Sequence, residues 1–152
     1  MSAPRLWATR ICYRVAYRLL QLVGILSGRH GHGVKCLLTH RDQILLVRHT
    51  YGQRQVWYLP GGGVRRSEQP LAAGLREMHE ELGLQEPPMC ELGRVELRLD
   101  HMSVTITCLH AELTDTSVYP NPSEIADAAW FALDELPSPL GSEVRRLSAL
   151  LQ

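Results

Sequence analysis

Hydrophobic residues recur at helical spacing in one stretch near the middle of the chain. Between Pro70 and Leu82, apolar residues follow one another at intervals of three and four, which predicts an amphipathic helix. Pro70 suits the first helical position, because the missing N–H of proline needs no partner there. Gly83 suits the position after the helix, where glycine readily adopts a left-handed conformation. The predicted apolar stripe consists of Leu71, Leu75, Met78 and Leu82.

Apolar runs on both sides of this helix predict β-strands. In residues 103–113, the apolar residues Val104, Ile106 and Cys108 alternate with Thr105, Thr107 and Leu109. This alternation is typical of a strand that is buried on one face and partly buried on the other. We expect strands at residues 34–39, 43–50, 56–59, 90–99, 103–113 and 128–131, and a closing helix at residues 143–151.

The first 29 residues differ in composition from the rest of the chain, since they contain several arginines and no acidic residue. On a helical wheel Ile11 and Val15 share one apolar face, whereas Arg10 and Arg14 share the opposite face. This pattern predicts a basic amphipathic helix over residues 1–29. We expect the helix to precede a domain at residues 30–152, with the glycine-rich residues 28–33 as a linker.

Several interpretations of this N-terminal helix stay open. The helix packs on the domain, or on a second subunit in a homodimer, or it attaches through residues 5–27 to an anionic membrane surface. Its arginine-rich and acid-free character also fits an organellar transit peptide, whereas no A-x-A-like cleavage site for a signal peptide follows it. The uncharged part, residues 19–28, is too short to span a bilayer.

Length and charge limit the remaining classes of function. A chain of 152 residues forms one domain with little to spare. The formal net charge is zero, so no broad positive field attracts nucleic acid, and we expect no nucleic acid polymer as a partner. The cysteines lack C-x-x-C pairing and therefore predict buried thiols in a reducing compartment, as in a cytoplasmic protein. They are Cys12, Cys36, Cys90 and Cys108.

Three glutamates of the predicted helix, Glu77, Glu80 and Glu81, have i, i+3, i+4 spacing and fall on a side away from the apolar stripe. Carboxylates this close raise each other's pKa values. A hard divalent cation such as Mg²⁺ would relieve this repulsion, because it prefers oxygen ligands and is usually shared with a phosphate. The alternative is a solvated acidic helix face. The preceding turn contributes Gly61 and Gly62, whose lack of a side chain lets the backbone come close to a ligand.

The full spacing of this stretch is more specific. Residues 62–84 fit the pattern G-x5-E-x7-R-E-U-x-E-E-x-G-U, in which U is a bulky aliphatic residue. This pattern is the Nudix box, and the chain resembles a Nudix hydrolase of the MutT-like type. The resemblance implies an α/β fold, an α/β/α sandwich around a mixed sheet, and Mg²⁺- or Mn²⁺-dependent hydrolysis. The fixed places are filled by Gly62, Glu68, Arg76, Glu77, Met78, Glu80, Glu81, Gly83 and Leu84.

The resemblance also implies roles for individual residues. Glu77, Glu80 and Glu81 would be metal ligands, and Glu77 is a candidate general base. Glu68 would orient the box, and Arg76 would pair with a box carboxylate and hold the ligands in place. Relatives take a further carboxylate from the loop before a W-F-like strand; here Glu124 lies six residues before Trp130 and fits a ligand or general base. We expect the catalytic residues to be Glu77, Glu80 and Glu124.

Substrate contacts are expected from the segment before the box. Arg48 would neutralise phosphate charge, and Tyr51 or Trp57 would stack on a base, although Trp57 equally fits an ordinary half-buried strand residue. Gly61 and Gly62 would contribute backbone groups. The leading hypothesis is hydrolysis of a nucleoside triphosphate, oxidised forms included, to monophosphate and pyrophosphate. The alternatives are an ADP-ribose or nucleotide-sugar pyrophosphatase and a non-catalytic nucleotide-binding sensor.

Overall fold

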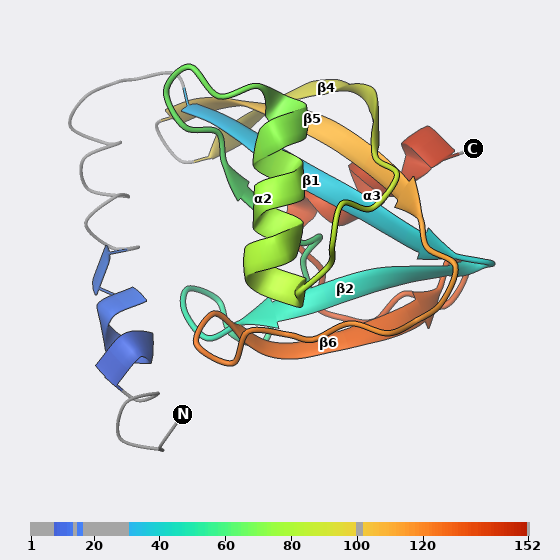
Figure 1. The fold of residues 1–152 in the computed structure, drawn as a ribbon, viewed down its shortest axis with the longest axis horizontal. Coiled ribbons are helices and arrows are strands. Elements are labelled where there is room, and N and C mark those ends of the chain that lie inside the picture. The colour runs from blue at the N-terminus through green and yellow to red at the C-terminus, as the bar shows by residue number, and fades with distance from the viewer. Residues whose placement is uncertain (1–7, 14, 17–30, 100–101, 152) are drawn as a thin grey trace.

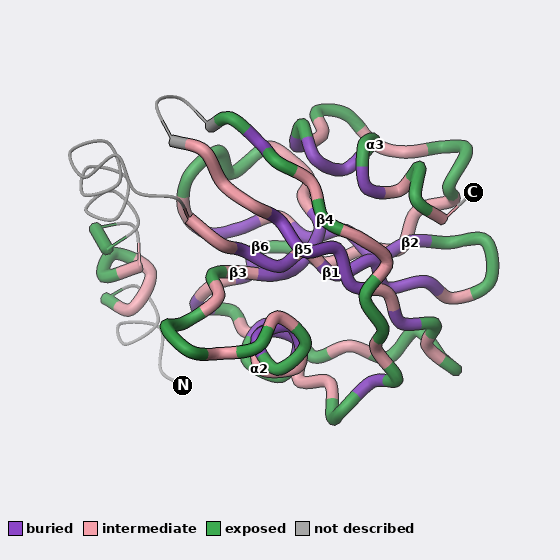
Figure 2. Tube along the Cα trace, turned by 90° about the horizontal axis from the view of Figure 1, so that it is seen from above, coloured by how far each residue is buried: buried purple, intermediate pink, exposed green. Residues whose placement is uncertain are grey.

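The computed structural model describes residues 8–13, 15–16, 31–99 and 102–151. One mixed sheet has helix α2 on one face and helix α3 on the other, and Figure 2 shows both helices flanking the sheet. The α/β/α sandwich predicted from the sequence is therefore confirmed (Figure 1). The elements are β1 (Gly31–His40), β2 (Gln43–His49), β3 (Gly61–Gly63), α2 (Pro70–Leu82), β4 (Cys90–Leu99), β5 (Met102–Glu112), β6 (Ile125–Ala132), α3 (Ser142–Ser148) and the 3₁₀ helix η1 (Ala149–Leu151).

The sheet opens between its two central strands. Its order is β4-β5-β1-β2-β6, with β3 paired to β1, and only the β1–β5 pair is parallel among the described strands. β1 and β2 pair only beside their connecting turn, at Thr39–Ile44 and His40–Gln43, and then separate. Helix α2 lies across this opening and contacts β1 and β3 (Figure 1). The start of the box and the box helix are thereby brought together.

Successive side chains of β1 point to opposite faces of the sheet and belong to two apolar clusters, one on each face. Val34, Cys36 and Leu38 pack with α2, whereas Leu37 packs with α3 on the opposite face. Because both faces are covered, β1 and β2 are apolar almost throughout rather than strictly alternating.

Helix α2 has the predicted bounds. Pro70 is its first residue, and Gly83 follows it in the left-handed conformation with φ 66°. The backbone N–H of Gly83 donates to the carbonyl of His79 and so closes the last turn. Both ends were predictable because their signals are local.

The predicted apolar stripe of α2 was wrong in its position around the helix. Leu71 is 43% exposed and Leu75 is half-buried, although Met78 and Leu82 are buried as predicted. The buried face turns instead toward smaller and acidic residues, which are Ala73, Gly74, Glu77 and Glu81. The physical reason is close packing: a Cβ on Gly74 would stand 2.2 Å from Cδ1 of Leu109 in β5, so a larger residue there requires the Leu109 side chain to shift.

Several element boundaries differ from the sequence predictions. β6 covers Ile125–Ala132 rather than residues 128–131. The predicted glycine turn, a name kept below for Gly61–Gly63, is the short strand β3. β1 begins at Gly31, inside the predicted linker, because His32 pairs with Thr105 of β5. Residues 56–59 form isolated bridges rather than a strand. The closing helix consists of α3 followed by η1 rather than one helix over residues 143–151.

The prediction of four buried cysteines was wrong for two of them. Cys36 and Cys108 are buried in the clusters on the two sheet faces, whereas Cys12 and Cys90 are exposed. Cys90 begins an edge strand, where outward-facing side chains meet solvent.

Part of the predicted N-terminal helix is described, and it lies beside the domain (Figure 1). Residues 8–13 and 15–16 are helical. The Nε of Arg10 donates to the carbonyl of Pro122 at 2.9 Å, so this part packs on the domain. The rest of the predicted helix lies outside the described residues, and the domain boundary at residue 30 stays a prediction. No helix among the described residues is long and apolar enough to cross a membrane.

Candidate active site

The glycine turn packs closely against helix α2 because its residues have no side chains. Gly61 has φ +141° and its Cβ would stand 2.2 Å from the carbonyl oxygen of Val34, so no other residue fits there without strain. Its N–H donates to Oε2 of Glu81 at 3.0 Å. A Cβ on Gly62 would stand 2.4 Å from Oε1 of Glu77. Gly62 therefore leaves the space that the Glu77 carboxylate occupies, and Gly61 supplies the N–H that bonds Glu81.

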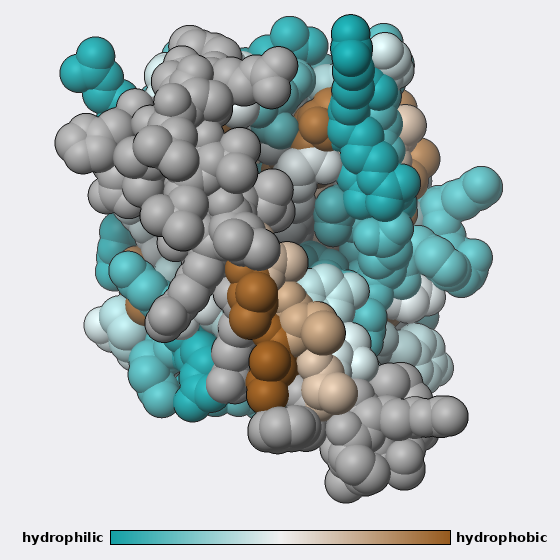
Figure 3. Space-filling model, turned by 90° about the vertical axis from the view of Figure 1, so that its left-hand side faces the viewer, coloured by the Kyte–Doolittle hydropathy of each residue, from teal (hydrophilic) through white to brown (hydrophobic). Residues whose placement is uncertain are grey.

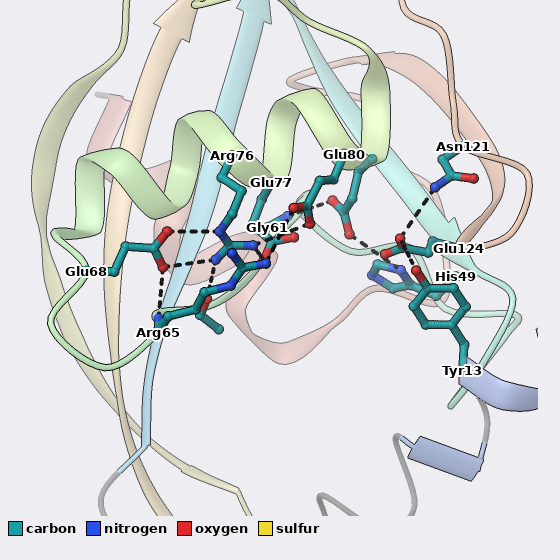
Figure 4. Close-up of polar contacts among 12 residues, drawn as sticks. Tyr13, His49, Gly61, Arg65, Glu68, Arg76, Glu77, Glu80, Asn121 and Glu124 are labelled. Atoms are coloured by element: carbon teal, nitrogen blue, oxygen red, sulfur yellow. Dashed lines mark hydrogen bonds and ion pairs between the residues drawn. The ribbon is translucent and has the colours of Figure 1, made fainter.

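Arg76 joins the turn to the carboxylates, as Figure 4 shows. Its Nε and Nη2 donate to the two oxygens of Glu68 at 2.9 and 3.1 Å, and Nη2 also donates to the carbonyl of Gly63 at 2.9 Å. Its Nη1 donates to Oε1 of Glu77 at 2.6 Å and to Oε2 of Glu80 at 3.4 Å. The hydrogen bond from Arg76 lowers the pKa of Glu68 to about 2. Arg76 thus contacts Glu68, the turn and two box carboxylates, and the supporting roles of Glu68 and Arg76 stay predictions.

The three box glutamates differ in their surroundings. Glu81 is only 1% exposed, and burial raises its pKa to about 8. Burial also raises the pKa of Glu77, against the opposing effect of the Arg76 guanidinium. Glu80 is exposed and lies 3.5 Å from the guanidinium of Arg65. Glu77 and Glu81 are buried carboxylates that a bound cation would stabilise, and Glu80 is free to turn toward it.

Glu124 reaches the same region from the loop before β6 (Figure 4). Its backbone carbonyl accepts from the N–H of Thr50 at 2.8 Å, which fixes the loop to the end of β2. Its Oε1 accepts from the Tyr13 hydroxyl at 2.7 Å and from Asn121 Nδ2 at 3.4 Å. The negative charge of Glu124 also contributes to the raised pKa of both buried glutamates. The fourth predicted carboxylate therefore belongs to this cluster.

The predicted substrate residues divide between the two faces of the sheet. Tyr51 stacks on His49, with ring centroids 4.9 Å apart, beside the glutamates. Trp57 packs edge-on against Phe131 at 4.9 Å and belongs to the apolar cluster that contains α3. The guanidinium of Arg48 lies over the Trp57 ring at 4.8 Å. The structure thus brings Tyr51, but not Trp57, to the carboxylates.

Two residues of the site were not predicted. His49 is buried, its Nδ1 lies 4.0 Å from Oε1 of Glu81, and burial lowers the pKa of its imidazole to about 3, so the ring is neutral. The alternation of Leu45, Val47 and His49 along β2 could have placed it on the α2 face. Tyr13 donates to Glu124 across 111 positions of sequence, and no local pattern indicates such a contact.

The donor set fits a hard divalent cation in chemistry, and the contacts show what must change for binding. Among the residues that the structure describes, no group of three potential ligand side chains already lies close enough together to hold a metal ion. Arg76 and Arg65 instead neutralise Glu77 and Glu80. All candidate donors are carboxylate oxygens, which suit Mg²⁺ or Mn²⁺, and two of them are buried beside the glycine turn.

The family model for the NUDIX domain matches residues 29–151, so the chain belongs to the Nudix hydrolase family, as the box predicted. Among solved structures, the fold is similar to a MutT NUDIX hydrolase from Burkholderia pseudomallei, with a TM-score of 0.75 and 25% identity, covering 82% of this chain and 99% of that chain.

Two curated relatives carry names that refer to RNA ends. The NAD-capped RNA hydrolase NudC of Pseudomonas aeruginosa is 31% identical over 101 residues, which are 66% of this chain and 36% of that protein. The m7GpppN-mRNA hydrolase NUDT17 of Danio rerio is 33% identical over 127 residues, covering 67% of this chain and 41% of that protein. This chain thus spans less than half the length of these two relatives.

Proposed function

We propose that this chain hydrolyses the pyrophosphate bond of a nucleoside diphosphate linked to another moiety, with Mg²⁺ or Mn²⁺. The observation that supports this proposal is a cluster of four carboxylates beside the glycine turn: Arg76 bonds two of them, the Gly61 N–H bonds the third, and the loop before β6 brings the fourth. A nucleoside triphosphate, oxidised forms included, is the first substrate class. ADP-ribose or a nucleotide sugar is the nearest alternative. The four carboxylates are those of Glu77, Glu80, Glu81 and Glu124.

The cation, when bound, would neutralise phosphoryl oxygens and lower the pKa of a coordinated water. Glu77, Glu80 and Glu81 would hold it. Arg76 keeps the Glu77 carboxylate against the turn, and the more exposed Glu80 would rotate away from Arg65 and from the longer contact with Arg76. Gly61 and Gly62 would offer backbone groups to the phosphates at close range.

Glu124 is our candidate for the general base that takes the proton of the attacking water. No arginine or lysine pairs with its carboxylate among the described residues, and its two contacts are a phenol and an amide. Such a carboxylate keeps a free lone pair for the water. Glu77, by contrast, is held by a guanidinium at 2.6 Å, which weakens it as a base.

The substrate named by the two curated relatives gives a second candidate. Their names refer to RNA with a nucleotide cap, in which the linked moiety is an RNA chain. The net charge of zero argues instead for a small nucleotide, as predicted. A test panel therefore needs both nucleotides and short capped or 5′-triphosphate RNA.

The deciding experiment is hydrolysis of that panel with Mg²⁺ and with Mn²⁺, with products identified by mass spectrometry. Glu77→Gln and Glu80→Gln proteins run alongside. We expect turnover by the wild type and its loss in both variants, and the product masses name the bond that is cut. Binding in calorimetry without turnover of any compound would replace the hydrolase by a nucleotide-binding sensor.

The partners of the N-terminal segment are a separate proposal. Hydrophobic side chains are visible on the face where this segment lies (Figure 3), and Ile11 is 36% and Val15 52% exposed. We propose peripheral contact with an anionic membrane through residues 5–27, with a homodimer as the alternative, in a cytoplasmic protein. Sedimentation with anionic vesicles at low salt tests the membrane contact, and sedimentation velocity tests the dimer.

A further inference from the structure

A cavity of about 270 Å³ lies between the N-terminal segment, the end of β2 and the start of β6. Among the residues that the structure describes, its lining holds three arginines and no acidic residue: Arg10, Arg48, Thr50, Arg54, Gln55 and Ala126. Guanidinium groups present planar forks of N–H donors that match the oxygens of a phosphate. The cavity is also smaller than the usual pocket for a drug-sized molecule, so it suits one compact group.

Carboxylates neutralise only part of the positive charge of the arginines in this cavity. Arg48 pairs with Asp127, yet its Nε is buried and has no hydrogen-bond partner. Within the described residues, neither Arg10 nor Arg54 forms an ion pair with a carboxylate. The buried Nε of Arg48 is costly without an acceptor. Arg54 is exposed and Arg10 uses its Nε for the carbonyl of Pro122, so both have further guanidinium donors for a ligand. An anion would offer acceptors to all three arginines.

The cavity adjoins the candidate active site through Glu124. Thr50, which lines the cavity, donates its N–H to the backbone carbonyl of Glu124 at 2.8 Å. Ala126, also in the lining, follows Glu124 by two positions. The same N-terminal turn sends Arg10 to the cavity and Tyr13 to the Glu124 carboxylate, and Figure 4 shows Tyr13 at that carboxylate.

We propose that this arginine cavity binds a phosphate group of the moiety that is attached to the scissile pyrophosphate. The inference rests on the proposed function for its substrate, and it assigns the chain a second anionic subsite beside the carboxylate cluster. It selects, among compounds with the same scissile bond, those that carry a further phosphate. It also gives Arg10, in the N-terminal segment, a role in substrate choice.

The first test measures binding of inorganic phosphate by calorimetry in metal-free, low-salt buffer. Arg10→Gln and Arg54→Gln are the test variants, and Arg146→Gln, an exposed arginine of α3, is the matched control. We expect each test variant to weaken phosphate binding about tenfold, because each removes a charged hydrogen-bond donor, and the control to bind as the wild type does. No binding to the wild type, or equal weakening in the control, would overturn the cavity as an anion site, whatever the catalytic activity.

The second test uses two substrates that share a triphosphate and differ by one phosphate, GTP and its 3′-phosphorylated derivative pppGp. We expect Arg10→Gln and Arg54→Gln to raise KM about tenfold for pppGp and less than twofold for GTP, with kcat unchanged. An equal effect on both substrates would overturn the assignment to the linked moiety. Weakened phosphate binding without any change in KM would also overturn it and would leave free phosphate as the ligand. If the wild type cleaves neither compound nor any other of the panel, the proposed function fails, while the binding test still decides the cavity.

Discussion

The replacement of Gly62 by alanine tests whether Glu77 acts from its place under the glycine turn. The new Cβ would stand 2.4, 2.5 and 2.8 Å from Oε1, Cδ and Oε2 of Glu77. Ordinary contacts of this kind are about 1 Å longer, so the carboxylate must move by roughly 1 Å. A shift of that size in a catalytic constellation costs about 10²-fold in rate, or about 3 kcal/mol in the activation free energy.

The same structure supplies a matched control in the next residue. Gly63 has no heavy atom within 4 Å of its Cβ position and no positive φ, so Gly63→Ala leaves the carboxylates in place. The assay compares kcat, metal affinity and melting temperature of the two variants with the wild type, on whichever nucleotide the panel identifies. We expect kcat to fall about 10²-fold in Gly62→Ala and less than twofold in Gly63→Ala. Because the atoms that must move are the end of a side chain, Gly62→Ala should lose less than about 2 kcal/mol of unfolding free energy.

The outcome that refutes this reasoning is a folded Gly62→Ala protein with wild-type activity and metal affinity. It would mean that Glu77 holds the cation from another position, or not at all. Equal loss in Gly62→Ala and Gly63→Ala would show instead that the backbone of the turn, and not the carboxylate beneath it, is the sensitive element.

Three further predictions concern stability, positioning and pH. Gly74→Ala should lower the free energy of unfolding, measured by urea titration, by about 1–3 kcal/mol, because its Cβ would meet Leu109 at 2.2 Å. Gly93→Ala is the control, since the space around its Cβ position is open and no contact would destabilise the protein. Equal effects of the two substitutions would contradict the packing argument. Tyr13→Phe removes the hydroxyl that donates to the candidate base Glu124. The loss of a hydrogen bond worth about 1 kcal/mol should lower kcat several-fold and shift the pH–rate profile. An unchanged profile would show that this hydrogen bond does not position the Glu124 carboxylate. The pKa of Glu81 is raised by burial to about 8, above the value near 4.5 of the unfolded chain, so its contribution to stability is complete below pH 4.5 and is lost as pH rises through 8. The melting temperature of the metal-free protein should therefore fall between pH 5 and 8 more steeply in the wild type than in Glu81→Gln, and Mg²⁺ should oppose the fall; parallel curves would remove Glu81 from the explanation.

Local signals account for what the sequence predicted well. Pro70 and Gly83 mark the ends of α2 through backbone preferences of single residues, and the box spacing depends on residues within one segment. Both can be read without knowledge of distant contacts. The alternating strands β4 and β5 were predicted within a residue or two for the same reason.

The burial of the site could not be predicted in this way. Glu77 and Glu81 are charged residues, and a helical wheel assigns them to solvent. The glycine turn leaves room for Glu77 at Gly62 and donates the Gly61 N–H to Glu81, and neither contact is visible on a helical wheel. The separation of Trp57 from the carboxylates has the same origin, since it depends on which face of the sheet its side chain joins.

The parallel pairing of β1 with β5 has a consequence for how the protein is made. Gly31 pairs with Val104 and Thr39 with Glu112. β1 therefore cannot form this pairing until β5, 73 positions later in the chain, has been synthesised. Helix α2 leaves the ribosome before Leu109, which forms part of the surface beneath it. A nascent chain therefore carries the whole box before the sheet beneath the helix is complete, and the loop that bears Glu124 is translated only after both.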